Sequence, residues 1–182
     1  MIARTVIAVL FALAGVAPAG EGDAMLQVND KRFTPGHAYL FKMQTPDFAG
    51  MTPKETQAGK IKWKIAPAVA LSDRPFDTAA LAKLESPLEA LEEMAQKGAV
   101  VITATVGTKG GAVDYLRVAL PGLSKRWEPD PSVATLTLAP AKGAKQSGRL
   151  QIKGDKKMHD FDPKNIPFID ADIKFEAAAP TR

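Results

Sequence analysis

Residues 168–176 read Phe-Ile-Asp-Ala-Asp-Ile-Lys-Phe-Glu, and this alternation of apolar and charged side chains decides the fold class. Successive side chains of a β-strand point to opposite faces of a sheet, so the segment separates its apolar residues from its charged ones. The apolar face consists of Ile169, Ala171, Ile173 and Phe175. We therefore expect a strand with one face on a hydrophobic core and the other face in water.

The same period of two recurs at Lys60–Ile65, which reads Lys-Ile-Lys-Trp-Lys-Ile. This pattern predicts a strand that buries Ile61, Trp63 and Ile65 and exposes the three lysines. Pro67 interrupts the segment soon afterwards.

Shorter apolar or β-branched segments between turn residues predict the remaining strands. They lie at residues 25–28, 32–33, 37–44, 68–71, 99–106, 112–119, 134–138 and 148–153. Asn29-Asp30 predicts a tight turn between the first two, because both residues tolerate positive φ. Residues 45–59 and 120–132 contain several prolines and glycines, so we expect loops there.

The segment Asp77–Lys97 predicts two short helices. Asp77 suits the N-cap of the first helix, and Ser86-Pro87-Leu88-Glu89 is typical of the start of the second, with Ser86 as its cap. Together with the strands, this predicts a mainly β protein. We expect an antiparallel β-sandwich or flattened barrel in which a helical insertion at about residues 77–97 covers one end or an open edge of the sheet.

The first nineteen residues have the composition of a secretory signal peptide. Arg4 is followed by an apolar run from Val6 to Val16 and then by Ala17-Pro18-Ala19, which predicts cleavage after Ala19. The apolar run is about half the length that a membrane-spanning helix needs, which disfavours the alternative of an uncleaved anchor. We expect an exported protein, periplasmic or extracellular, with no transmembrane segment after cleavage.

Residues 20–182 then form a single β-rich domain with a frayed C-terminal tail from Ala177. The sequence contains no cysteine, which excludes a disulfide framework, a thiol nucleophile and a thiolate metal site. The net charge of +4 is mild, and the basic residues are not interleaved with stacking aromatic residues. We therefore expect no nucleic-acid partner, while the oligomeric state stays open.

Common catalytic signatures are absent from the sequence, including the serine-nucleophile elbow, the zinc-protease helix, the phosphate-binding loop and the dinucleotide fingerprint. The chain has only two histidines, His37 and His159, which disfavours histidine-based metal chemistry. These observations favour a non-enzymatic protein without a cofactor or a metal centre.

Two short segments are candidate binding sites. Asp73 and Arg74 lie in Leu71-Ser72-Asp73-Arg74-Pro75, where they either contact a ligand or bond local amides in a turn. Trp127 follows Lys125-Arg126, so its indole either docks on a lipid surface or a protein partner, or folds back and closes one end of a sandwich.

A third candidate lies in the acidic segment Asp155–Asp172, with His159, Asp160 and Asp162 as its central residues. Histidine beside a carboxylate can act as an acid–base pair in hydrolysis, and several carboxylates can hold a hard cation such as calcium. The spacing does not match an EF-hand loop and lysines intervene, so a solvated turn explains the same residues.

Several short elements also occur together in a distinctive order. They are Ala38-Tyr39, Val69-Ala70-Leu71-Ser72-Asp73-Arg74-Pro75, Gly98 before a Val-rich strand, Ser147-Gly148-Arg149-Leu150 and Ile169-Asp170-Ala171-Asp172-Ile173-Lys174-Phe175. In this combination the chain resembles a loose group of exported bacterial proteins that share a Leu-Ser-Asp-Arg/Lys-Pro element. Ala177-Ala178 depart from the apolar-proline ending of that group. The group has no assigned activity, so the resemblance implies no catalytic residues.

Three functions are hypotheses at this point. The one we expect is a non-enzymatic domain that binds a protein or an envelope component, which predicts an exposed apolar patch or an unpaired strand edge. The second is a carrier of a small apolar ligand in a cavity lined by Tyr39, Phe41, Trp63 and Phe175. The third is a hydrolase that uses His159 and its neighbouring carboxylates.

Overall fold

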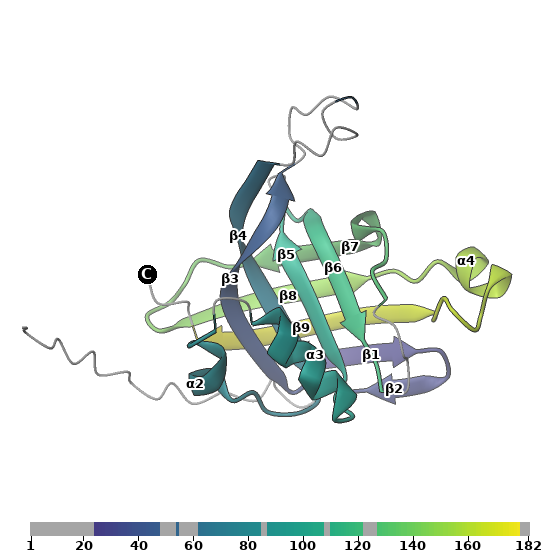
Figure 1. Ribbon diagram of the computed structural model, residues 1–182, viewed down its shortest axis with the longest axis horizontal. Helices are drawn as coiled ribbons and strands as arrows, with labels where there is room; N and C mark the ends of the chain where they lie inside the picture. Colours follow the sequence, from purple (N-terminus) through teal and green to yellow (C-terminus); the bar gives the residue numbers. More distant parts are fainter. Residues whose placement is uncertain are drawn as a thin grey trace, which may run out of the picture.

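Two antiparallel β-sheets form the body of the protein in a computed structural model that describes residues 24–47, 54, 62–84, 87–107, 110–121 and 127–178. The sheets pack face to face with their strands running crosswise (Figure 1). This confirms the predicted sandwich with a short helical insertion, and the sheets do not close into a barrel. The predicted signal peptide at residues 1–19 lies outside the described residues.

The first sheet has five strands in the order β2-β1-β9-β8-β7. They are β1 (Ala24–Val28), β2 (Lys31–Phe33), β7 (Ala134–Leu138), β8 (Lys145–Ile152) and β9 (Ile169–Ala178). The alternating segment at residues 168–176 forms most of the central strand β9, and its predicted apolar face is buried. The predicted turn is also present, with Asn29 at a φ of 52°.

The end of β9 differs from the prediction of a frayed tail from Ala177. Ala177 pairs with Gln146 of β8 and Ala178 pairs with Lys145, so the strand continues to Ala178. The Ala177 side chain is buried in the core between the sheets, which explains why the strand extends that far.

The second sheet has four strands in the order β3-β4-β5-β6. They are β3 (His37–Asp47), β4 (Lys62–Ser72), β5 (Val101–Val106) and β6 (Val113–Ala119). β3 and β4 pair along their whole length, from His37 opposite Ser72 to Asp47 opposite Lys62. The prediction of a loop from Thr45 was therefore wrong at its start, because residues 45–47 stay paired with β4 and the Thr45 side chain is buried.

The core between the sheets consists of aliphatic side chains from alternate positions of both sheets. Its fully buried members include Leu26, Leu71, Ile102, Leu116, Leu136, Leu150, Ile152, Ile169 and Ile173. One position in this core requires a glycine. A Cβ added at Gly148 on β8 would lie 2.9 Å from Cδ2 of Leu138 and even nearer the ring of Phe175, so the phenyl ring occupies the space of a side chain.

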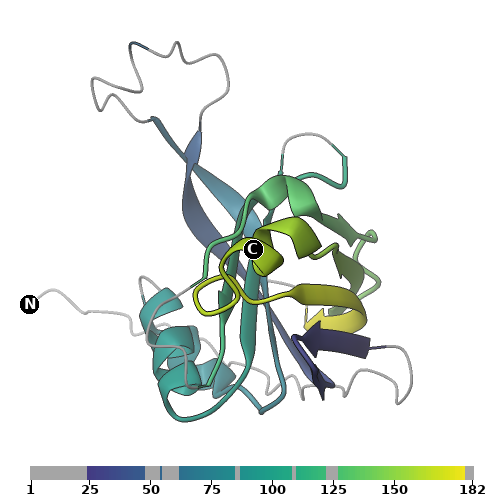
Figure 2. The ribbon, with the colours of Figure 1, turned by 90° about the vertical axis from the view of Figure 1, so that its right-hand side faces the viewer.

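A second apolar cluster covers the outer face of the four-stranded sheet. Helices α2 (Thr78–Leu81) and α3 (Leu88–Gln96) contribute Leu81, Leu91 and Ala95 to it, against Phe41 and Ala70 of the sheet. Figure 2 shows the resulting three layers, with the helices on one side and the five-stranded sheet on the other. The expectation that the helical insertion covers an end or an edge was wrong, because α3 lies against the inner strand β5.

The helix starts agree with the prediction in part. Asp77 caps α2 as expected, its Oδ1 accepting from the amide of Ala80 at 2.9 Å. α3 begins at Leu88, one residue after the predicted first helical position at Pro87, and Ser86 lies outside the described residues. Two short helices are additional findings, the 3-10 helix η1 (Pro131–Val133) and α4 (Lys156–Phe161).

Candidate functional site

The β3–β4 hairpin extends beyond the body of the sandwich. β5 pairs with β4 only from Ala68 onward, so residues 42–47 of β3 and 62–67 of β4 pair only with each other among the described strands. We call this part of the hairpin the arm. Both ribbon views show the arm projecting away from the two sheets (Figures 1 and 2).

One face of the arm carries two large apolar side chains in water. The Trp63 side chain is 60% exposed and the Ile65 side chain is 69% exposed. The prediction that these residues are buried was wrong. They do share a face with the core residues Val69 and Leu71 of the same strand, but at the height of the arm no strand of the five-stranded sheet lies opposite to cover them.

The opposite face of the arm is tied to the body by a charged pair. The Nζ of Lys64 donates to Oδ2 of Asp114 on β6 at 2.6 Å and lies 3.8 Å from Oδ1 of Asp47. The hydrogen bond to Asp114 raises the pKa of the Lys64 ammonium above its ordinary value. Lys64 was expected in water, whereas it is half-buried and contacts Asp114 on the face opposite Trp63 and Ile65.

Both edges of the arm contain a proline. Pro46 lies on β3 and Pro67 lies on β4, and neither has an N–H group to donate to an added strand. Lysines, which also protect strand edges, occur on both strands at Lys42 and Lys62. The arm is therefore poorly suited to strand addition, and its available surface is the side-chain face around Trp63 and Ile65.

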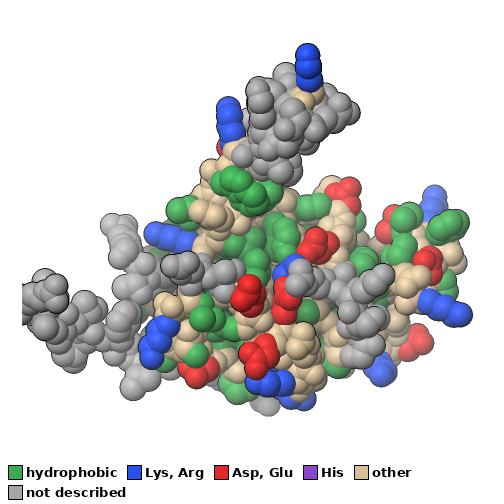
Figure 3. Space-filling view, in the orientation of Figure 1, with side chains coloured by type: hydrophobic (Ala, Val, Ile, Leu, Met, Phe, Trp, Pro, Cys, Tyr) green, Lys and Arg blue, Asp and Glu red, His purple; other side chains and the backbone are tan. Residues whose placement is uncertain are grey.

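The arm as a whole carries a net positive charge, with three lysines and one aspartate. Lys42 is exposed on the face of Trp63 and Ile65, and Lys62 is exposed on the opposite face, across from Asp47 on β3. Asp47, the only acidic residue on the arm, lies near Lys64 on the other face. Figure 3 shows hydrophobic and basic side chains together where β3 and β4 leave the body. The arm thus combines an exposed apolar face with a net positive charge.

The predicted pair Asp73 and Arg74 stabilises a local turn. Oδ1 of Asp73 accepts from the amide of Val100 at 2.8 Å, and Nη1 of Arg74 donates to the carbonyl of Lys97 at 2.8 Å. The Arg74 amide also donates to Oγ of Ser72 at 3.1 Å. These contacts attach the end of β4 to the segment after α3. Of the two roles considered for Asp73 and Arg74, ligand binding or local bonding in a turn, the contacts support the second.

Trp127 lies against the body of the sandwich. Its amide and carbonyl exchange hydrogen bonds with Val118 of β6, at 3.2 and 2.9 Å. The half-buried indole packs against the core between the sheets. The structure therefore places Trp127 where it closes the sandwich, and its neighbours Lys125 and Arg126 lie outside the described residues.

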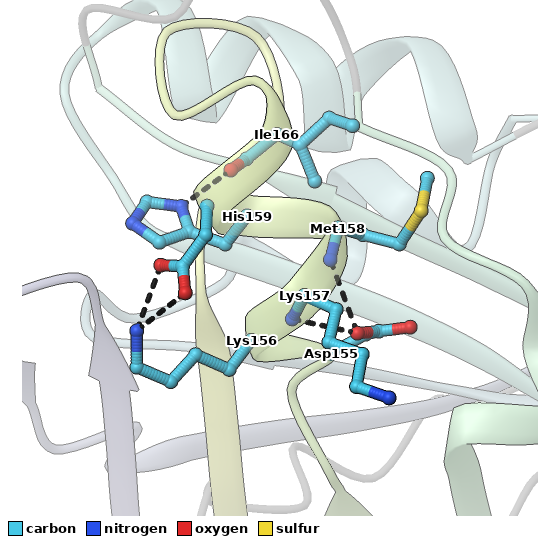
Figure 4. A network of polar contacts seen from close by, with 7 residues as sticks. Asp155, Lys156, Lys157, Met158, His159 and Ile166 are labelled. Carbon is cyan, nitrogen blue, oxygen red and sulfur yellow. Dashed lines mark hydrogen bonds and ion pairs between the residues drawn. The ribbon is translucent and has the colours of Figure 1, made fainter.

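His159, Asp160 and Asp162 belong to α4 and the turn after it, where local contacts engage them. Nδ1 of His159 lies 2.7 Å from the carbonyl oxygen of Ile166, and Nζ of Lys156 donates to both carboxylate oxygens of Asp160 at 2.7 Å (Figure 4). Asp162 accepts from the side-chain amide of Asn165 at 2.9 Å.

The structure does not bring the three predicted candidates into one site. Asp73 and Arg74 contact the segment after α3, Trp127 contacts β6, and α4 lies at one end of the sandwich away from α3 in both ribbon views. Within the described ranges no group of three or more metal-ligating side chains occurs.

The four residues expected to line a ligand cavity also lie apart. Phe175 lies in the core between the sheets, whereas Tyr39 and Phe41 stack in the outer cluster with their ring centroids 5.6 Å apart. Trp63 is exposed on the arm. Because these side chains occupy three different surfaces, they do not line one cavity.

A charged network that the sequence patterns missed fastens α3 to the sheet. Arg117 on β6 is only 8% exposed and forms ion pairs with Glu92 of α3 and Glu128, the latter at 2.9 Å. The hydroxyl of Tyr115 lies 3.4 Å from Oε1 of Glu128, and burial raises the pKa of Tyr115 to about 12. The one sequence feature that could have indicated this network is the presence of an arginine, Arg117, inside the apolar segment at residues 112–119.

Comparisons with protein-family models, curated proteins and solved structures gave no match. Among the helices formed by the described residues, none has the length and apolar character needed to cross a membrane.

Proposed function

We propose that this chain is an exported, non-enzymatic binding domain that attaches to a component of the bacterial cell envelope through the Trp63–Ile65 face of the arm. The observation that carries the proposal is the exposure of these two side chains, 60% and 69%, side by side on a projecting hairpin. Large apolar side chains gathered on an exposed surface are typical of interaction sites.

Two further observations, on the N-terminal sequence and on the other candidate residues, support the proposal. The signal-peptide composition of residues 1–19 supports export to the periplasm or beyond. The contacts of Asp73, Arg74 and His159 support structural roles, because each bonds to nearby backbone groups. Hydrolysis at His159 and transport of a small apolar ligand stay hypotheses, and no specific observation favours either one.

The first test measures retention on isolated envelopes. Residues 20–182, which include every described residue, are mixed with washed bacterial envelopes and sedimented. We expect the wild-type protein to co-sediment and the double variant Trp63→Ser, Ile65→Ser to lose about tenfold or more in affinity, since it removes two large apolar contacts. Phe161→Ser is the matched control, because Phe161 is 84% exposed on α4 rather than on the arm.

Equal retention of all three proteins, or no retention of the wild type, would contradict the proposed function. A second measurement concerns export itself. Cells that express the full chain are fractionated, and the N-terminus of the recovered protein is sequenced. We expect recovery outside the cytoplasm with residues 1–19 removed, whereas an intact cytoplasmic protein would contradict export.

A further inference from the structure

We infer that the envelope component bound by the arm is an anionic phospholipid surface. This inference rests on the proposed function and names its ligand class. The first argument is charge complementarity. The arm carries three lysines and one aspartate, so its net charge is positive. Lys42 is exposed on the same face as Trp63 and Ile65, whereas Lys62 is exposed on the opposite face, across from Asp47 on β3. A lysine close to an anionic lipid surface gains favourable electrostatic energy there.

The second argument is the type of apolar side chain. Indole rings favour the boundary between lipid headgroups and acyl chains, because they combine a large apolar body with one N–H donor. Trp63 and Ile65 lie two residues apart on one strand and therefore point to the same side. With Lys42 on the same face and Lys62 next to Trp63 along the strand, the arm combines large apolar side chains with basic ones, a combination that binds membrane surfaces peripherally.

The third argument is the shape of the site. The arm projects from the sandwich in both views, so it can reach a flat surface while the body stays in water (Figures 1 and 2). Pro46 and Pro67 disfavour an added strand from a protein partner. A second copy of the chain would bring its own lysines against Lys42 and Lys62, so like charges oppose a symmetric contact between two arms.

The inference is tested with lipid vesicles and residues 20–182. One vesicle preparation contains phosphatidylglycerol and phosphatidylcholine in equal parts, and the other contains phosphatidylcholine alone. We expect the wild-type protein to co-sediment with the anionic vesicles and to dissociate as salt is added. Trp63→Ser with Ile65→Ser lowers binding about tenfold or more. Lys42→Gln with Lys62→Gln lowers it about tenfold, from two lost lysine contacts.

Matched controls separate the arm from general surface charge. Phe161→Ser removes an equally exposed aromatic ring, and Lys156→Gln with Lys157→Gln removes two exposed lysines from α4. Both control proteins retain binding within about twofold of the wild type. A loss as large as that of the arm variants would overturn the inference, because non-specific attraction would then explain binding. Unfolding curves confirm that all variants are folded.

The outcomes also separate this inference from the proposed function. Retention on envelopes without binding to anionic vesicles would overturn the lipid assignment and leave a protein or wall polymer as the partner, with the proposed function intact. Equal binding to both vesicle types would overturn the role of anionic charge. Self-association that Trp63→Ser abolishes, with no vesicle binding, would identify a second copy as the occupant. Failure to bind envelopes at all would end the proposed function itself.

Discussion

The ammonium of Lys64 on β4 lies 2.6 Å from the carboxylate of Asp114 on β6, on the face of the arm opposite Trp63 and Ile65. The two residues are fifty positions apart in the chain. Because neighbouring side chains of a strand point to opposite sides, Lys64 lies on the side of the outer cluster, and Trp63 and Ile65 lie on the side of the core between the sheets, beyond its end. The exposed apolar face and the ion pair are therefore two consequences of one orientation.

Asp114→Asn is predicted to lower the free energy of unfolding by about 1 kcal/mol, the size expected for a partly exposed ion pair. Urea unfolding at neutral pH measures this loss. Lys42→Gln, on the same arm but without a carboxylate contact in the described structure, is the control and should change stability by less than about 0.5 kcal/mol. Equal effects of the two substitutions would contradict the role assigned to Asp114.

The same pair predicts how stability changes at high pH. The pKa of Lys64 is raised in the folded protein, so its contribution is fully present below the ordinary lysine value of 10.5. That contribution is lost as the pH rises through the folded pKa. Wild type and Asp114→Asn should therefore differ in stability near neutral pH and converge above pH 10.5, as measured by urea unfolding across this range. A constant difference would contradict the assignment.

Gly148→Ala is predicted to destabilise the protein by about 1–3 kcal/mol, the usual cost of overpacking a core. The new methyl group would meet the Phe175 ring and Leu138, both of which pack in the core between the sheets. Gly36→Ala is the matched control, because a Cβ at Gly36 meets nothing within 4 Å. Thermal and urea unfolding compare the two, and an unchanged Gly148→Ala protein would show that Phe175 does not pack as described.

Arg117→Met is predicted to loosen α3, because it leaves the Glu92 carboxylate without its ion pair to the sheet. We expect a loss of about 2–4 kcal/mol, near the lower range for breaking a buried ion pair. Amide hydrogen exchange should accelerate most in Leu88–Gln96 and less in the five-stranded sheet. Arg149→Met, which breaks a pair with Asp172 that is nearly half exposed, is the control and should cost less than about 1 kcal/mol.

Tyr115 is predicted to titrate with a midpoint of about 12, because burial disfavours its phenolate. The chain has two tyrosines, and burial also raises the pKa of Tyr39, so Tyr39→Phe isolates the Tyr115 signal. Phenolate absorbance measures the titration, while circular dichroism checks that the protein stays folded. The stability contribution of neutral Tyr115 is lost as pH rises from about 10 to about 12. A midpoint at the ordinary tyrosine pKa of 10.0 would contradict its burial.

Local sequence patterns correctly predicted elements such as a strand that has the hydrophobic core on one side and water on the other. β9 is such a strand, so the alternation of its apolar and charged residues predicted both the strand and the residues that it buries. The turn at Asn29 and the cap at Asp77 depend on hydrogen bonds and dihedral angles within a few residues. Such features follow from the sequence because nothing distant decides them.

The orientation of the arm could not be predicted in the same way. Alternation shows that Trp63 and Ile65 share a face, but whether that face is covered depends on where the other sheet ends. The partner of Lys64 is likewise distant in sequence. The Arg117 network joins β6, α3 and Glu128, three segments with no common local pattern. The part of the candidate site that was missed is therefore the part set by long-range packing.

Binding through the exposed face of the arm is tested most directly by acrylamide quenching of Trp63 fluorescence in the Trp127→Phe protein, whose remaining indole is on the arm. Quenching is measured first for the free protein and then with washed envelopes added. We predict a readily quenched indole in the free protein, as its 60% exposure requires, and a shielded, blue-shifted indole once envelopes are present. An indole already shielded in the free protein, or one equally accessible with and without envelopes, would contradict the account.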